Sequence, residues 1–198
     1  MGKLALTMLA DSITALNKRD MELANSVDMQ KIKLREYDTD IETKTLRLIA
    51  LYQPMAVDLR RLATILKTIT YLYRLGRYGK DIAAVVEYIV DVPSLSELLG
   101  IQHLWEHVKP MIEDALYAFD NADLSKIKDF ETRDNEIDQM RWGIFRESVS
   151  FMMENPKNIT ICAHIIMIAR YLERCGDHAC KIAEKVHYMV TGEHIEIS

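Results

Sequence analysis

The sequence predicts an all-α protein made of two tandem three-helix bundles that are related by internal duplication. Three observations support this fold class. Apolar residues recur every three or four positions over long segments, and no segment shows the alternation of a β-strand. Only 7 glycines and 4 prolines interrupt the 198 residues. The helix breakers divide the chain into two halves that repeat one scheme of three helices, as a duplicated unit would.

The first half is expected to contain helices at residues 3–17, 20–52 and 53–90. A polar turn at 17–20 separates the first two helices. Pro54 opens the third helix, where a missing N–H group costs least, and the segment 91–94 stops it. The first repeat is therefore expected at residues 1–92, followed by a linker at 93–100.

The second half is expected to contain helices at residues 101–119, 123–153 and 155–190. A turn at 120–123 joins the first two helices, Pro156 opens the last one, and Gly192 lies just beyond its end. The second repeat is therefore expected at residues 101–198. Long helices joined by short turns form antiparallel bundles.

Apolar stripes indicate which helix faces are buried. The last helix carries nine apolar residues that step alternately by four and three positions. These residues are Ile161, Ile165, Ile168, Leu172, Cys175, Ala179, Ile182, Val186 and Met189. The preceding helix has a row at every seventh residue and three large side chains beside it: Phe130, Ile137, Ile144 and Phe151, then Trp142, Phe145 and Met152. We interpret the aromatic and methionine side chains in these stripes as core.

Two glycines interrupt the stripes at corresponding places. Gly76 lies in the sequence LYRLGR at 72–77, and Gly176 lies 100 positions later in LERCGD at 172–177. A glycine inside a helix costs about 1 kcal/mol relative to alanine, and close helix packing is the usual compensation. A second match is between DTDIE at 38–42 and DNEID at 134–138, which lies 96 positions later.

Composition and charge exclude several classes of protein. The chain has 25 Lys and Arg against 30 Asp and Glu, a net charge of −5, so nucleic acid is not an expected partner. Three cysteines in apolar helical segments indicate a reducing compartment. No uncharged apolar run of 18 residues could span a membrane, and the N-terminal segment, which carries Asp11, lacks the features of a secretory leader. We therefore expect a cytoplasmic protein.

Carboxylates occur where the apolar stripes call for apolar groups. Asp134 lies in the same row as Phe130 and Ile137, and Asp138 follows one turn later. The candidate metal ligands are Asp134, Asp138, Glu173 and Asp177, with Asp38 and Glu42 as weaker candidates. Paired carboxylates from two helices offer hard oxygen ligands to Mg²⁺, Mn²⁺ or iron, and Zn²⁺ is a further candidate ion. The alternative is that these acids are solvated or pair with Arg141, Arg170 and Arg174.

No motif for catalysis is present in the sequence. The chain has no phosphate-binding loop, nucleophile elbow or HExxH motif. Glu184 and His187 form the only Glu-x-x-His pair, whereas a ferritin-like di-metal bundle needs two. His103 and His107 are one turn apart but lack a third ligand. A di-metal oxidase or metal-storage bundle remains an alternative function, as does a signalling adaptor unrelated to phosphate.

The sequence resembles the PhoU family of phosphate-uptake regulators over essentially its whole length. The first half carries QPMAVDLR at 53–60 followed by LYRLGR. The second half carries MMENP at 152–156, YLERCGDHA at 171–179 and KIAE at 181–184. These segments resemble the family's Q-P-x-x-x-D-L-R and L-E-R-x-G-D-x-A patterns and occur in the same order.

The resemblance implies two three-helix bundles in a cytoplasmic homodimer without enzymatic activity. It also implies repression of the phosphate-starvation response through contact with the phosphate transporter ATPase and with a sensor histidine kinase, so any association with the membrane is indirect. Some family members bind metal clusters through (E/D)-x-x-x-D motifs, which Glu173 with Asp177 and Asp134 with Asp138 match. The first repeat departs from this pattern at Tyr73 and Arg77. We therefore expect metal in the second repeat only, and we expect Arg77 to pair with Asp38 and Glu42.

Overall fold

The computed structural model describes residues 1–90 and 100–197, and within these residues it contains helices and no strand. The helices are α1 (Gly2–Lys18), α2 (Met21–Tyr52), α3 (Ala56–Ala83), α4 (Val86–Ile89), α5 (Ile101–Asn121), α6 (Phe130–Glu154) and α7 (Ile159–Thr191), with short 3₁₀ turns η2 (Ser125–Ile127) and η3 (Pro156–Asn158). The predicted all-α fold class is confirmed. None of the helices in the described ranges is both long and apolar enough to cross a lipid bilayer.

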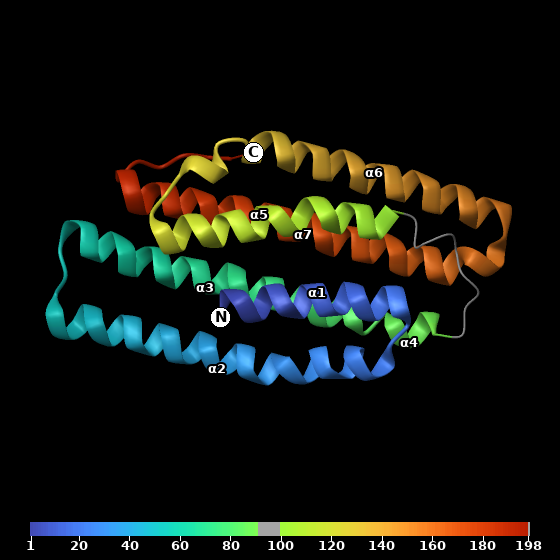
Figure 1. Cartoon of the computed structure of the whole chain (residues 1–198), viewed down its shortest axis with the longest axis horizontal. Helices are drawn as coiled ribbons and strands as arrows, with labels where there is room; N and C mark the ends of the chain where they lie inside the picture. Colours follow the sequence, from blue (N-terminus) through green and yellow to red (C-terminus); the bar gives the residue numbers. More distant parts are fainter. Residues whose placement is uncertain (91–99, 198) are drawn as a thin grey trace.

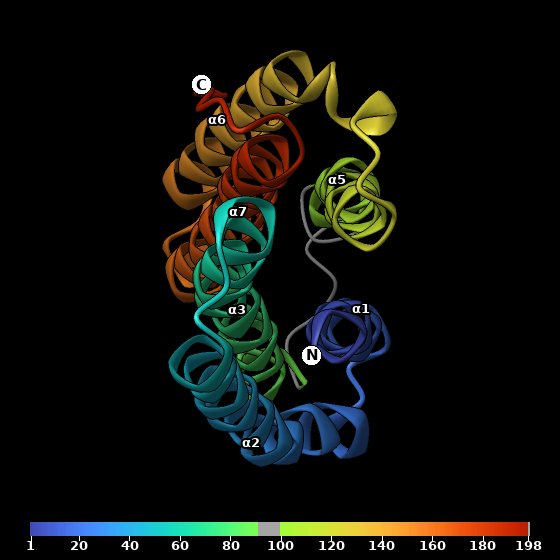
Figure 2. The ribbon, with the colours of Figure 1, turned by 90° about the vertical axis from the view of Figure 1, so that its left-hand side faces the viewer.

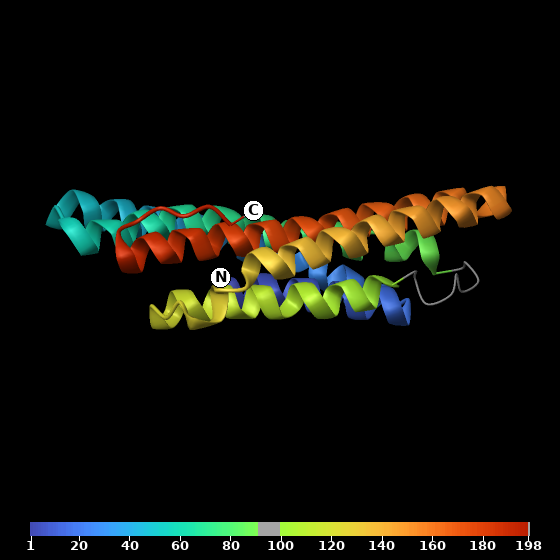
Figure 3. The ribbon, with the colours of Figure 1, turned by 90° about the horizontal axis from the view of Figure 1, so that it is seen from above.

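The two repeats pack side by side through their last long helices (Figure 1). Helices α1, α2 and α3 contact one another, as do α5, α6 and α7, and α3 packs along α7 between the two bundles. Figure 2 shows α2, α3, α7 and α6 as a curved layer, with α1 and α5 on its concave side. Seen from above, α1 and α5 again form a second layer (Figure 3). The α2–α3 and α6–α7 turns lie at opposite ends of the molecule (Figure 1).

One apolar core runs through both bundles. All nine residues of the predicted α7 stripe are buried, as are Phe130, Ile137 and Ile144 of α6. The interpretation of Trp142 and Phe145 as core residues is wrong, since they are 49% and 37% exposed. Helix α6 packs mainly against α7 and only lightly against α5, so side chains beside its central row remain at the edge of the bundle.

Local capping interactions place several helix ends where the sequence predicts them. The Asp20 carboxylate accepts a hydrogen bond from the Leu23 N–H group at 2.9 Å and so caps α2. Gly192 ends α7 in the left-handed conformation, with φ of 83°. The Asn155 side chain accepts a hydrogen bond from the Lys157 N–H group at 3.1 Å and begins the η3 turn.

Four helix boundaries differ from the prediction by at least three residues. Helices α3 and α7 begin at Ala56 and Ile159 instead of 53 and 155, because the left-handed Gln53 and the η3 turn precede them. Helix α3 ends at Ala83 instead of continuing to residue 90, and a turn that includes Val85 leads into α4. Neighbouring β-branched Val85 and Val86 weaken a helix at this point because their χ1 angles are restricted. Helix α6 begins at Phe130 instead of 123, because Asp123 accepts hydrogen bonds from the N–H and hydroxyl groups of Ser125 and forms a local turn.

The segment 91–94, which was predicted to end the third helix, lies outside the described residues. Helix α3 already ends before it, at Ala83. The predicted linker at 93–100 also lies outside the described residues, apart from Gly100 at the start of α5.

Candidate functional site

Helices α6 and α7 bring together the four acids of the second repeat, which we call the carboxylate cluster: Asp134, Asp138, Glu173 and Asp177. Gly176 permits this approach, because a Cβ atom there would lie 3.2 Å from Asp134 Oδ1 and 3.3 Å from Ile137 Cδ1. The close packing predicted at this glycine is confirmed. The four acids also influence one another electrostatically, as the pKa shifts of Asp134 and Glu173 show.

Asp134 is the most perturbed acid of the carboxylate cluster. Its side chain is buried, at 7% exposure, and the Cys180 thiol donates a hydrogen bond to it. The pKa of Asp134 is raised to about 6, chiefly by burial and also by the neighbouring charges of Asp177 and Asp138, while Cys180 and Lys181 oppose the shift. No basic side chain in the described part of the chain lies within ion-pair distance of this carboxyl group. Asp134 is therefore an acid that is costly to ionise in the folded protein.

Glu173 is buried but has a cationic partner. Arg170 Nη1 donates to both carboxylate oxygens, at 2.7 and 2.8 Å, and Arg141 Nε lies 3.7 Å from Oε1. The pKa of Glu173 is nevertheless raised, mainly by burial. The charges of Arg170 and Arg141 lower this pKa, and those of Asp177 and Asp138 raise it. The charge of Glu173 is thus compensated within the protein.

Asp177 is also engaged by an arginine. Arg174 Nη1 lies 2.9 Å from Asp177 Oδ2, and the two side chains are 45% and 30% exposed. The predicted alternative, in which arginines form ion pairs with these acids, is therefore confirmed for Glu173 and Asp177. Asp138, which is exposed, makes no ion pair within 4.0 Å among the described residues.

The carboxylate cluster offers hard oxygen ligands, but its present arrangement does not fit a preformed metal site. Across residues 1–90 and 100–197, no three His, Cys, Asp or Glu side chains are grouped so that they could hold an ion. Glu173 and Asp177 would first have to exchange their arginines for the metal. Metal binding at Asp134, Asp138, Glu173 and Asp177 therefore stays a prediction.

The first repeat differs from the second more than its sequence suggests. A Cβ atom on Gly76 would collide with the side chain of Leu34, whereas one on Gly176 would contact Asp134 and Ile137. The buried residues Val27, Leu34 and Thr45 of α2 lie 103 positions before the buried residues Phe130, Ile137 and Ser148 of α6. Leu34 therefore corresponds to Ile137, and Lys31 and Arg35 correspond to Asp134 and Asp138. The alignment of Asp38 with Asp134 is wrong by about two helical turns, because packing sets the register between the helices.

The expected pairing of Arg77 with Asp38 and Glu42 is also wrong. Within the described ranges Arg77 has no carboxylate within 4.0 Å, and it instead lines a pocket with basic residues of α2 and α3. Burial raises the pKa of Asp38, with a further contribution from Glu42, and Arg77 does not counter it. The sequence analysis missed this basic pocket, although Lys31 and Arg35 are one helical turn apart in α2.

The remaining sequence candidates have structural roles. Glu184 is buried, and its Oε1 lies 2.7 Å from Lys181 Nζ and accepts a hydrogen bond from the Ile197 N–H group at 3.0 Å. His187 Nδ1 lies 3.1 Å from the backbone oxygen of Glu193. The single Glu-x-x-His pair thus helps to hold the C-terminal segment against α7.

Known proteins similar to this chain share its fold over nearly the full length. Two solved structures match: PhoU from Pseudomonas aeruginosa, with a TM-score of 0.93 and 31% identity, covering 98% of this chain and 93% of that chain; and the phosphate transport system regulatory protein PhoU from Streptococcus pneumoniae, with a TM-score of 0.89 and 26% identity, covering 98% and 92%.

Curated relatives carry the same family name. The "Phosphate-specific transport system accessory protein PhoU homolog" of Caulobacter vibrioides is 38% identical over 196 residues, which are 98% of this chain and 85% of that protein. The protein of the same name from Rhizobium meliloti is 37% identical over 193 residues, 97% of this chain and 81% of that protein. The PhoU domain profile matches residues 1–86 and again 101–186, so the chain belongs to the PhoU family.

Proposed function

We propose that this chain is a non-enzymatic regulator of phosphate uptake that represses the phosphate-starvation response by binding the phosphate transporter ATPase or a sensor histidine kinase. The observation that supports it best is the PhoU domain match in both repeats, together with relatives named as accessory proteins of the phosphate-specific transport system. Such a protein changes its partner's activity only if it binds two states of that partner with different affinity. We place it in the cytoplasm as a homodimer.

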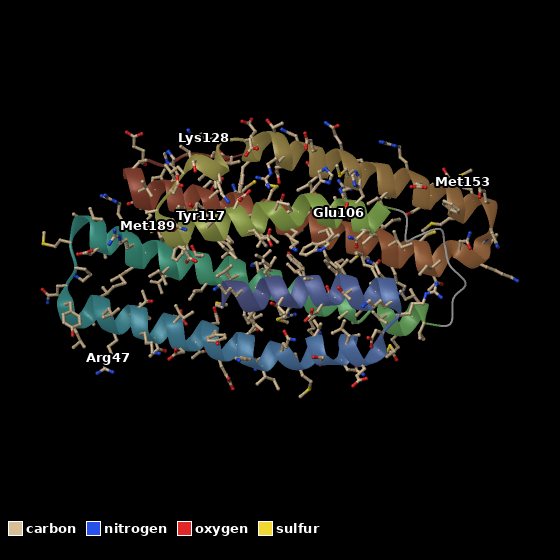
Figure 4. The ribbon with its side chains drawn as sticks, viewed as in Figure 1. Arg47, Glu106, Tyr117, Lys128, Met153 and Met189 are labelled. Atoms are coloured by element: carbon tan, nitrogen blue, oxygen red, sulfur yellow. The ribbon has the colours of Figure 1, made fainter. Side chains whose placement is uncertain are left out.

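Exposed apolar side chains at the hairpin ends support a role in protein binding. At the α2–α3 turn Leu51, Tyr52 and Met55 are 62%, 74% and 81% exposed. At the α6–α7 turn Met153 is 83% exposed (Figure 4) and Ile159 is 50% exposed. Grouped apolar side chains on a surface mark interaction sites, and methionine adapts well to different partner surfaces.

The function is tested by gene expression in a deletion strain. In phosphate-rich medium, a bacterium that lacks this gene should express its phosphate-starvation genes, and expression of the intact chain should silence them again. Unchanged expression in the deletion strain would contradict the proposed repression.

A pull-down identifies the partner and separates this function from that of an unrelated adaptor. The tagged chain, recovered from cells grown with high and low phosphate, should retain the transporter ATPase or a sensor kinase in amounts that depend on phosphate. A double variant, Leu51→Ser with Met55→Ser, should retain less partner if the α2–α3 turn contributes. Retention of neither partner under either condition would count against the proposed mechanism.

A further inference from the structure

A pocket of about 320 Å³ lies between α2 and α3 of the first repeat. We call it the basic pocket, and its lining side chains are Lys31, Ile32, Arg35, Tyr73, Arg77 and Lys80. Four of these six side chains are cationic, and two neighbouring helices supply them (Figure 1). The basic pocket thus concentrates positive charge on a protein whose net charge is −5.

The two arginines of the basic pocket lack counter-charges. Lys31 pairs with Asp28 at 2.9 Å, and Lys80 lies 3.5 Å from Asp81. In the described part of the chain, neither Arg35 nor Arg77 has a carboxylate within 4.0 Å of its guanidinium group or makes a side-chain hydrogen bond. Two guanidinium groups that face one pocket without anionic partners repel each other, and a bound anion would relieve this repulsion.

The second repeat carries the opposite charges at the corresponding positions. The packed glycines Gly76 and Gly176 set an offset of 100 residues between α3 and α7, and the buried residues of α2 and α6 match at an offset of 103. At these offsets Lys31 and Arg35 correspond to Asp134 and Asp138, and Tyr73 and Arg77 correspond to Glu173 and Asp177. The same helix pair therefore presents acids in one repeat and bases in the other. Solubility alone does not call for this reversal, since either sign of charge would be solvated.

We propose that the basic pocket binds a small free oxyanion of the phosphate class that carries at least two negative charges. Guanidinium groups hold phosphate oxygens through paired hydrogen bonds, and Arg35 and Arg77 would supply such donors from two helices. Lys31 and Lys80 add charge, and the Tyr73 hydroxyl adds a donor. A volume of about 320 Å³ corresponds to roughly ten water molecules at about 30 Å³ each, which leaves room for an anion with several waters. The pocket would bind such an anion whether or not the chain regulates phosphate uptake.

Calorimetric titration of the full chain with pyrophosphate and with inorganic phosphate tests the proposal. The titrations are made at constant ionic strength, adjusted with chloride. The double variant Arg35→Gln with Arg77→Gln is compared with wild type and with Arg47→Gln. Arg47 is a matched control because it is an exposed arginine of α2 that lies about 18 Å along the helix from Arg35, at 1.5 Å per residue. Figure 4 shows Arg47 near the α2–α3 turn. Thermal unfolding of each variant confirms that it folds.

Wild type and Arg47→Gln should bind pyrophosphate saturably at one site, more tightly than phosphate, and the double variant should bind at least about tenfold more weakly. Bound anion should also raise the melting temperature of wild type but not of the double variant. Absence of saturable binding to wild type, or equal weakening in Arg47→Gln, would overturn the proposal. Binding to vesicles that contain a phosphoinositide, without competition by pyrophosphate, would overturn the assignment to a free anion.

Discussion

Asp134 is a buried acid that has no basic partner within ion-pair distance among the described residues. Because its folded-state pKa of about 6 lies above the unfolded value of 3.8, its ionisation opposes folding. This cost is absent below pH 3.8 and is fully present once the pH has risen through 6. The first repeat avoids this cost, because the corresponding residue is the exposed Lys31.

The variant Asp134→Leu should therefore stabilise the protein at pH 7 by roughly 1–3 kcal/mol. Asp134→Asn, which removes only the charge, should give a smaller gain. Denaturant unfolding in the presence of a chelator at pH 7 and pH 4 measures both effects. The gain should shrink toward zero at pH 4, and a gain that is the same at both pH values would contradict the assigned cost of ionisation.

The asymmetry between the repeats predicts where a divalent metal binds. In the first repeat the positions of the carboxylate cluster are occupied by Lys31, Arg35, Tyr73 and Arg77, none of which is an acid. Titration of wild type with Mn²⁺ should show binding. The double variant Glu173→Ala with Asp177→Ala should lose this binding, and Asp38→Ala should keep it. Because Arg174 holds Asp177 at 2.9 Å, Arg174→Gln should strengthen the binding. Equal losses from changes in either repeat, or no uptake of Mg²⁺, Mn²⁺ or Fe²⁺ supplied in excess, would show that the acids serve only to pair with arginines.

Among the described helices, α1 and α3 have the closest approach of one backbone to another at a glycine. A Cβ atom on Gly79 would lie 2.9 Å from backbone atoms of Met8 and Leu9, and a backbone cannot move aside as a side chain can. Gly79→Ala should therefore cost roughly 1–3 kcal/mol of stability.

Gly143 is the matched control because a Cβ atom there meets no atom within 4 Å. Gly143→Ala should stabilise the protein by about 0.5–1 kcal/mol through helix propensity alone. Melting temperatures that move in the same direction for both variants would contradict the packing assigned to α1 and α3.

The helices themselves were predictable because the information for them is local. The apolar stripe of α7, the polar turn at 17–20 and the Gly192 stop are visible within short windows of sequence, and each is confirmed. The register between α2 and α3 was not predictable, since it depends on contact between Leu34 and Gly76, which are far apart in sequence. The similar acidic motifs at 38–42 and 134–138 therefore suggested an alignment of the two repeats that the helix packing contradicts.

The candidate site was predictable in part for the same reason. Its acids and their arginine partners lie one turn apart on single helices, so spacing alone connects Glu173 with Arg170 and Asp177 with Arg174. The basic pocket needs α2 and α3 side by side before its charges can be seen together.

In the molecule as a whole, the α3–α7 contact joins the two bundles, and His178 lies within it. Its ring packs against Tyr71 and Tyr78 of α3, with centroids 5.6 and 5.8 Å away. Its Nε2 atom is buried and has no hydrogen-bond partner among the described residues. The pKa of His178 is lowered to about 4, chiefly by burial and also by the charges of Arg74 and Arg174, while Asp177 opposes the shift.

Because the unfolded value of 6.5 lies above the folded one, the unfolded chain takes up the proton first as the pH falls. His178 should therefore reduce stability between pH 6.5 and 4, by roughly 1–3 kcal/mol in total. The variant His178→Phe should keep the ring packing and flatten the fall in unfolding free energy over this range. The exposed His103→Phe is the control, and an unchanged acid slope in His178→Phe would exclude this role.

The proposed repression of phosphate uptake is best tested by the rate at which whole cells take up labelled phosphate. The measurement compares a strain that lacks the gene, the same strain with the intact chain restored, and the parent, all grown in phosphate-rich medium. The deletion strain should take up phosphate faster than the parent, and the restored chain should return the rate to the parental value. Equal uptake rates in all three strains would contradict the proposed function.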